Sequence, residues 1–142
     1  MKTMLLQDGD LIPGDEGFQA VSGEKKLRQD LGVALREPIG VDRFHPGWGS
    51  YLPGFIGQAI TERLRQQVQA EGFRVVSAYS MVQLDTIRAD QAAGSRQRVN
   101  DGEVVRSVDD VRAAPQYDSI HLRVSVSTMA GRVFDLVQTV RP

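Results

Sequence analysis

The last third of the chain has the most regular pattern of apolar and polar positions. Between residues 120 and 127 apolar side chains alternate with His, Arg and Ser, and this period of two indicates a strand with one buried face. A connection containing Gly131 leads to a second alternating segment at 133–140. A valine-rich segment at 104–111 precedes them, and we expect that strand to end by Pro115. The pattern predicts an antiparallel meander of about three strands.

Apolar residues recur at helical spacing further toward the N-terminus. Three leucines and an alanine between residues 27 and 35 lie on one helical face. Ser22 is a suitable N-cap for this helix, and Pro38 should end it near Arg36 because the residue before a proline disfavours helical backbone.

Two more helices are expected before the meander. The first runs from Phe55 to Ala70, with Gly72 placed to stop it. The second runs from about Ser77 to Ala93. Residues 1–22 contain two turn sequences rich in Gly and Asp and should form short strands or a hairpin. The sequence therefore predicts one α+β domain over residues 1–142, with about three helices, a C-terminal antiparallel three-stranded meander and a short N-terminal extended segment.

A long loop at residues 36–54 separates the first two predicted helices. It contains three prolines and four glycines, which exclude a regular helix, and it holds the aromatic residues Phe44, Trp48 and Tyr51. These rings either pack into the core or anchor a partner protein, since such residues dominate interface energetics. His45 lies among them, and a structural or interface role suits it better than metal binding. We treat all four as candidate interface residues.

Composition narrows the classes of function. Of 142 residues, 17 are Lys or Arg and 18 are Asp or Glu, whereas a nucleic-acid-binding domain should carry a clear basic excess. The absence of cysteine excludes disulfides and thiolate zinc sites, and His45 and His121 alone do not make a catalytic metal site. The apolar runs are too short to span a bilayer. We expect a soluble, cytoplasmically made protein without cofactor, nucleic acid or membrane as a partner.

The residue patterns of common enzymes are missing. No G-x-S-x-G elbow or phosphate-binding glycine loop with a following Lys-Ser/Thr occurs. Glu37 and Asp42 flank the start of the aromatic loop, and two carboxylates suffice for a glycosidase. A peptidoglycan hydrolase that uses this pair stays an alternative, although we expect a non-enzymatic protein.

The last predicted strand is the second candidate for an interface. An edge strand carries unpaired backbone N–H and C=O groups that another chain can complete. Only Arg141 and Pro142 follow it. The candidate residues of this strand are Val133, Phe134, Asp135, Leu136, Val137, Gln138, Thr139 and Val140.

Two short motifs resemble a known family. One is the helix start G-x-x-K-[LV]-x-Q-[DS], and the other is the loop P-x-[WY]-G-S-x-[LF]. They are carried here by Gly23, Lys26, Leu27, Gln29 and Asp30, and by Pro46, Trp48, Gly49, Ser50 and Leu52. With the order of elements, they resemble the contractile-phage baseplate wedge or tail sheath-initiator family, including its members labelled tail lysozymes. The Glu-Pro-Arg signature that such proteins often carry after a later helix is not found in this sequence.

The resemblance implies a structural role in the virion. Such a protein would sit in the tail baseplate after assembly in the host cytoplasm, in about six copies. Its partners would be the tail sheath protein, baseplate wedge proteins and the tail tube or hub, and it would start sheath assembly by strand exchange. A general protein-interaction adaptor outside a phage is the third alternative.

Overall fold

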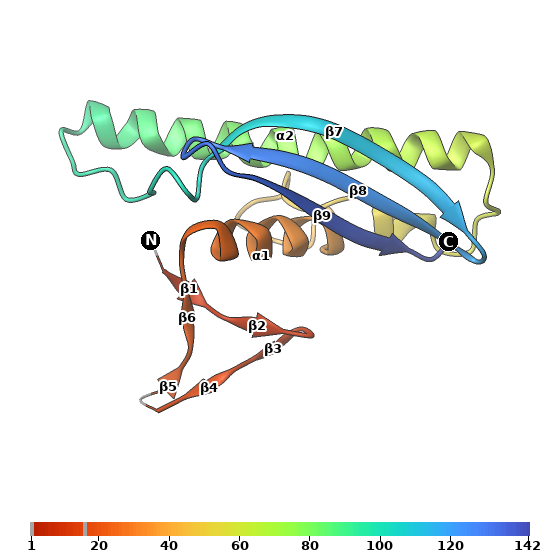
Figure 1. Cartoon of the computed structure of the whole chain (residues 1–142), viewed down its shortest axis with the longest axis horizontal. Coiled ribbons are helices and arrows are strands. Elements are labelled where there is room, and N and C mark those ends of the chain that lie inside the picture. The colour runs from red at the N-terminus through yellow and green to blue at the C-terminus, as the bar shows by residue number, and fades with distance from the viewer. Residues whose placement is uncertain (1, 16) are drawn as a thin grey trace.

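Two helices and a three-stranded sheet form the body of the protein in a computed structural model that describes residues 2–15 and 17–142. Helix α1 is followed by the much longer α2, and the antiparallel sheet has the order β7-β8-β9 (Figure 1). The elements are α1 (Gly23–Arg36), α2 (Glu62–Ala92), β7 (Val105–Gln116), β8 (Ser119–Thr128) and β9 (Val133–Val140).

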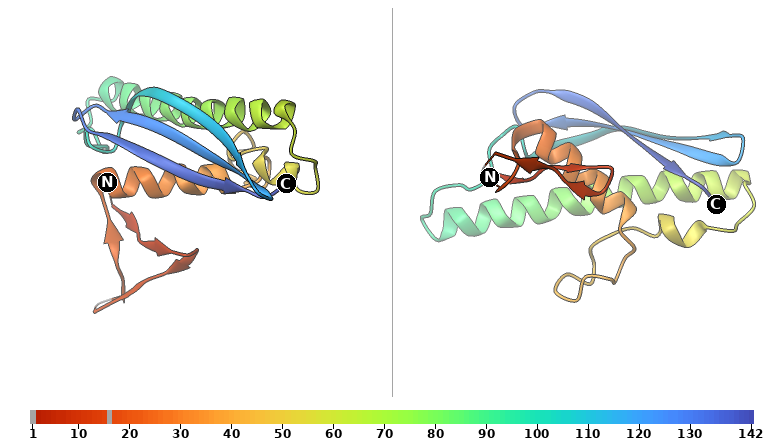
Figure 2. Two further views of the ribbon diagram at one scale, coloured as in Figure 1. Left: turned by 45° about the vertical axis from the view of Figure 1, so that its right-hand side comes forward. Right: turned by 90° about the horizontal axis from the view of Figure 1, so that it is seen from below.

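The core lies between the sheet and the helices. Helix α2 packs against β7 and β8, and α1 lies along β9 (Figures 1 and 2). Every second residue of β8 from Ile120 to Val126 is fully buried, as the alternation predicts. Leu27, Leu31 and Leu35 of α1 meet these side chains in one hydrophobic cluster. The opposite face of the sheet carries the polar residues of the alternation.

The expectation of about three helices was wrong, because the segments predicted at 55–70 and 77–93 belong to one helix of 31 residues. Gly72 does not stop it. A Cβ at Gly72 would lie 2.8 Å from Leu122 Cδ2, so this glycine lets α2 approach the sheet closely. Val75 and Val76, whose β-branched side chains favour strands, are buried in the helix–sheet core. Tertiary packing has overridden local propensity here.

The long helix also starts later than expected. Its N-cap is Thr61, whose side chain accepts a hydrogen bond from the backbone N–H of Leu64 at 3.1 Å. Before it, the residues from Leu52 to Phe55 form a short 3₁₀ helix, η1 (Leu52–Phe55). Among the described residues, no helix is both long and apolar enough to cross a membrane.

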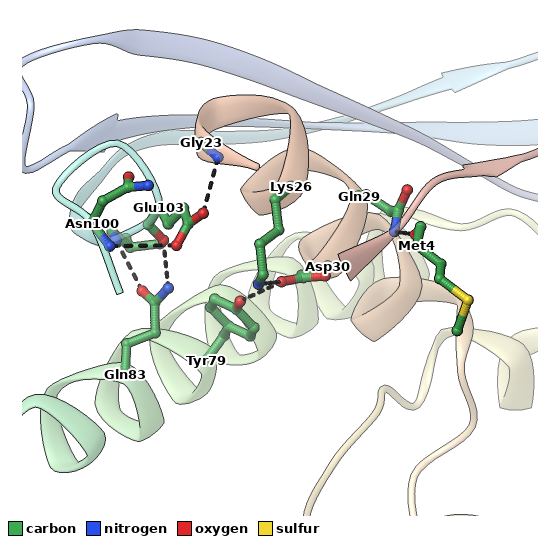
Figure 3. A network of polar contacts seen from close by, with 10 residues as sticks. Met4, Gly23, Lys26, Gln29, Asp30, Tyr79, Gln83, Asn100 and Glu103 are labelled. Carbon is green, nitrogen blue, oxygen red and sulfur yellow. Dashed lines mark hydrogen bonds and ion pairs between the residues drawn. The ribbon is translucent and has the colours of Figure 1, made fainter. Parts of the chain in front are cut away.

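Helix α1 begins and ends as predicted, but its cap has a different origin. Ser22 holds the N-cap position without a side-chain cap bond. The carboxylate of Glu103, from the loop before β7, instead accepts a hydrogen bond from Gly23 N at 3.0 Å (Figure 3). Glu103 is buried, and a negative charge at a helix N-terminus is favourable. This bond ties α1 to the start of the sheet.

A polar network joins the two helices inside the same region. Tyr79 of α2 donates a hydrogen bond to Asp30 Oδ2 at 2.9 Å, and Asp30 also forms an ion pair with Lys26 (Figure 3). Burial and the nearby Asp30 charge raise the pKa of Tyr79 above its ordinary value. The phenol therefore stays protonated and keeps donating to Asp30.

The N-terminal segment folds into an arm that extends from the body beside α1 (Figure 1). We call residues 2–15 and 17–21 the N-terminal arm; Met1 and Glu16 of the expected extended segment lie outside the described residues. The side-chain amide of Gln29 anchors it, accepting from Leu6 N and donating to Met4 O, each at 2.9 Å. Its antiparallel pairs are β1 (Thr3–Met4) with β6 (Ala20–Val21), β2 (Leu6–Gln7) with β3 (Asp10–Leu11), and β4 (Pro13–Gly14) with β5 (Gly17–Phe18).

Candidate docking edge of the sheet

The β8–β9 hairpin determines which backbone groups of β9 face outward. Thr128 N donates to Arg132 O at 2.8 Å, so this pair is hydrogen-bonded. Hydrogen-bonded and non-hydrogen-bonded pairs alternate along an antiparallel ladder. Following the register from Ser127↔Val133 to His121↔Thr139, the residues of β9 that direct N–H and C=O away from β8 are Val133, Asp135, Val137 and Thr139.

One contact agrees with this orientation. Arg28 Nη1 of α1 donates to Asp135 O at 2.6 Å, and the Arg28 guanidinium lies 4.7 Å from the centre of the Phe134 ring. The Asp135 carbonyl must therefore point toward α1 and away from β8. The outward row of β9, which we call the β9 edge, thus has two carbonyls bound by side chains of its own chain, because Gln138 Nε2 also donates to Thr139 O at 3.2 Å.

The side chains along β9 show the same alternation. Val133 and Val137 are 65% and 58% exposed, whereas Phe134, Leu136 and Val140 are buried in the core. The register with β8 is regular over the whole strand, without a bulge. Regular, uninterrupted edges with exposed β-branched side chains are those that pair most readily with another chain.

The opposite edge, formed by β7, is capped by side chains of α2. Gln83 Oε1 accepts from Val105 N at 2.9 Å. Gln69 Oε1 accepts from Ala113 N at 3.3 Å, and Arg65 Nη1 donates to Ala113 O at 3.2 Å. Within the described chain, these contacts occupy outward backbone groups at both ends of β7.

Two further features interrupt the β7 edge. The β7–β8 register shifts twice, between Val105 and Ser107 and again between Val108 and Asp110, and bulges of this kind disturb further pairing. Pro115 has no N–H to offer. The strand continues through Pro115 to Gln116, which corrects the expected end, because a proline is tolerated on an edge strand.

The aromatic loop is held against the body at Trp48. Its Nε1 donates to Glu37 Oε2 at 2.8 Å, and its ring lies 5.6 Å from that of Tyr79. Gly49 beside it has φ of 102°, and a Cβ there would lie 2.6 Å from Glu37 O. Trp48 is thus partly buried against the hydrophobic cluster, so its ring serves packing.

The two remaining rings of the loop are exposed. Tyr51 is 55% exposed, with the Arg74 guanidinium 5.3 Å from its ring centre. Phe44 is 90% exposed. Its loop is ordered by Asp42, whose carboxylate accepts from Phe44 N at 2.8 Å and contacts His45 Nδ1 at 3.0 Å. The loop tip therefore presents a large apolar ring to solvent from a hydrogen-bonded turn.

The two carboxylates considered for hydrolysis are engaged in different contacts. Glu37 accepts the Trp48 indole N–H, and Asp42 holds the turn at Phe44 and His45. The hydrogen bond from His45 lowers the pKa of Asp42 below its ordinary value. A general acid needs the opposite shift. Among the described residues, no group of three or more His, Asp or Glu side chains is arranged to hold a metal ion.

Several residues at the two edges were not found from the sequence. Arg28 and Arg36 lie eight residues apart on the exposed side of α1, with Gly32 midway between them. This i, i+4 spacing indicates that the two arginines share one face of the helix, and it could have been recognised in the sequence. Gln69 and Gln83 gave none, because glutamine is common on solvent-exposed helix faces. Only the packing of α2 beside β7 shows that they cap backbone groups.

The fold and its edges define an α+β domain whose sheet is capped on the β7 side and open on the β9 side. Comparison of the chain with models of protein families, with curated proteins and with solved structures gave no match.

Proposed function

We propose that this protein is a non-enzymatic assembly component that binds another polypeptide by strand addition at the β9 edge. The observation that carries the proposal is the outward row of backbone groups at Val133, Asp135, Val137 and Thr139, which continues without a bulge along the strand. Added strands gain main-chain hydrogen bonds, and alternate side chains supply specificity.

The contrast with β7 supports this assignment. Long regular edges are a hazard for aggregation, and natural proteins commonly interrupt or cover them. This chain does so at β7, with two register shifts, Pro115 and the side chains of α2. At β9, two side chains bind outward carbonyls among the described residues, Arg28 at Asp135 O and Gln138 at Thr139 O, and both are exposed contacts. An uncovered edge beside a well-protected one is expected when the uncovered edge has a partner.

The setting we propose is the baseplate of a contractile tail or related injection machine. It is supported by the motif resemblance over residues 23–57. In this setting the tail sheath protein supplies the added strand, and wedge subunits contact other surfaces. Phe44 is our proposed anchor for such a second contact, because a rigidly held exposed aromatic ring loses little conformational entropy on binding.

The decisive test is a proline at an outward position of β9. Val137→Pro removes one outward N–H and leaves the inward ladder to β8 unchanged, whereas Val137→Ala shortens the side chain and keeps the N–H. We expect Val137→Pro to prevent sheath assembly on baseplates and Val137→Ala to permit it, as seen by electron microscopy of tails. Normal contractile tails with Val137→Pro would contradict the proposal.

Amide hydrogen exchange provides a second test of strand addition at the β9 edge. In the isolated protein the amides of Val133, Val137 and Thr139 should exchange rapidly, because they face solvent. Mixing with the sheath protein should slow them, while the amide of Val105, bound by Gln83, changes little. Slow exchange of the outward amides in the isolated chain would show that the edge is already covered and would overturn the proposal.

A further inference from the structure

Helix α1 presents a row of three residues along the β9 edge. Arg28, Gly32 and Arg36 follow one another at four-residue spacing, which places them on one face of the helix. Arg28 reaches Asp135 O near the start of β9. Arg36 shares a groove with Gln138 and Arg141 near its end. Arg28 therefore lies near the start of β9 and Arg36 near its end, with α1 beside β9 (Figure 1).

Two hollows lie on either side of this row. One, of about 280 Å³, lies between the end of β9, the end of α1 and η1, and includes the exposed Ile56. The other, of about 260 Å³, lies between α1 and the N-terminal arm, with Leu6 and Asp8 on the arm side. Arg36 lines both hollows. We call the two hollows together the edge groove; β9 lines the first, the N-terminal arm lines the second, and α1 lies between them.

The surface of α1 is low at Gly32, where the Arg36 side chain folds back and its Nε donates to Gly32 O at 3.1 Å. A Cβ placed on Gly32 would find only Arg36 Nη2 within 4 Å, at 3.9 Å. A larger side chain at this position would project into the space beside β9. With glycine there, a strand paired to β9 can cross α1 closely.

The groove is lined mainly by positive charge. Lys25, Arg28, Arg36 and Arg141 lie along it, against Asp8 and Glu24. Glu24 is already paired, with Arg28 at 3.2 Å and with Arg132 at 3.9 Å. Among the ion pairs of the described residues, none includes Lys25, Arg36 or Arg141. An occupant with carboxylates would complement these cations.

We propose that the strand added at β9 is an acidic amphipathic segment of a partner protein, with carboxylates that meet Arg36 and Arg141. Its alternate apolar side chains pack toward Ile56 and Leu52 at the η1 end of the groove, and the other side chains face solvent. This inference rests on the proposed strand addition and adds the chemistry by which the partner is recognised. The charge on the strand thereby selects among the many sequences able to pair with a bare edge.

The test measures binding of two synthetic peptides to the full chain by fluorescence anisotropy. Each is a labelled ten-residue peptide of alternating Val and Thr, one with Glu at both ends and one with Lys at both ends. We expect the Glu peptide to bind roughly tenfold more tightly at low salt, since several exposed charge pairs each contribute modestly. The difference should shrink in 0.5 M NaCl, because salt screens exposed charges (Debye length about 10 Å at 0.1 M).

Charge-reversal variants identify the cations responsible. Arg36→Glu and, as an independent variant, Arg141→Glu should each weaken binding of the Glu peptide about two- to fivefold. Arg63→Glu, an exposed arginine on α2 away from the groove, is the matched control and should leave binding unchanged. Equal affinity for both peptides, or equal effects of Arg63→Glu and the groove variants, would overturn the acidic-strand inference.

The two proposals fail in different ways. If Val137→Pro leaves tight Glu-peptide binding unchanged while Arg36→Glu weakens it, the groove selects acidic segments and strand addition is wrong. If the sheath protein protects the outward β9 amides and the Glu peptide has no advantage, strand addition holds and the charge inference is wrong. A concentration-dependent dimer in sedimentation, abolished by Arg36→Glu, would make a second copy the occupant and overturn the proposed partner.

Discussion

The two edges of one sheet, β7 and β9, meet very different surroundings. Beside β7, α2 supplies Gln83, Gln69 and Arg65 as hydrogen-bond partners for outward backbone groups. Beside β9, α1 supplies Arg28. The availability of an edge for pairing therefore depends on the side chains of the neighbouring helix as well as on the bulges and Pro115 of the strand itself.

Helix length explains why the two helices differ in this way. The 31 residues of α2 extend along the full length of β7, and Gly72 brings its backbone close to the sheet. Helix α1 has 14 residues and lies along β9, and its row of Arg28, Gly32 and Arg36 lines the edge groove. A short helix with a glycine in that row leaves the space that a partner strand would need.

The largest difference between the two edges should be in the free energy of unfolding that is lost when a capping side chain is removed. Gln83 accepts from Val105 N and donates to Glu103 O at 2.5 Å, and both residues are buried (Figure 3). Gln83→Leu would remove the partner of the buried Val105 N–H and the hydrogen bond to Glu103 O, which should lower the free energy of unfolding by roughly 2–4 kcal/mol. Urea denaturation measures this change.

The matched change at the other edge is Arg28→Leu. It frees Asp135 O toward solvent, where water replaces the lost partner, so the loss of stability should be below about 1 kcal/mol. If the two variants lost equal stability, the β9 edge would depend on its helix as much as β7 does, and the contrast drawn between them would not hold.

A smaller difference in stability is expected between proline substitutions at two neighbouring positions of β9. Gln138→Pro removes an inward N–H that pairs with Leu122 in the β8 ladder, and this should lower the free energy of unfolding by about 1–3 kcal/mol. Val137→Pro removes an outward N–H, so its effect on folding should be roughly 0.5 kcal/mol or less. Thermal or urea unfolding of both variants measures the difference. A reversed order would mean that the assigned hydrogen-bonding register is wrong.

The smallest effect concerns pH at the β7 edge. Glu62 binds Arg65, which in turn donates to Ala113 O. The hydrogen bond from Arg65 lowers the pKa of Glu62 from 4.5 to about 2. The pKa of Glu62 is lower in the folded state than in the unfolded state. The stabilisation that the Glu62–Arg65 pair gives the fold is therefore fully present above pH 4.5 and is lost as pH falls toward 2.

Replacement of Glu62 by Gln isolates this contribution. The free energy of unfolding of Glu62→Gln, measured in urea from pH 2 to 7, should match the wild type near pH 2 and fall below it above pH 4.5. A constant difference across that range would show that the carboxylate charge is not responsible. The corresponding pair beside the β9 edge is Glu24 with Arg28, at 3.2 Å, and Arg28 in turn donates to Asp135 O.

The aromatic loop shows a limit of reasoning from residue type. Phe44, Trp48 and Tyr51 were equal candidates in the sequence. The structure separates them, because the Glu37 carboxylate and the Tyr79 ring, 11 and 31 positions away, hold Trp48 inward, whereas Phe44 has only a local turn beneath it. Which aromatic ring is exposed depends on partners that are distant in the chain.

The sequence alone determined the start and end of α1, the three antiparallel strands near the C-terminus, and the buried face of β8, because these follow from periodicity and proline placement within a few neighbouring residues. Only the tertiary structure decided that 62–92 is one helix and that Glu103 caps α1. It also decided which sheet edge stays open. Each of these depends on side chains that meet across dozens of residues, where packing against the sheet outweighs the weak local preferences of Gly72, Ser22 or Gln83.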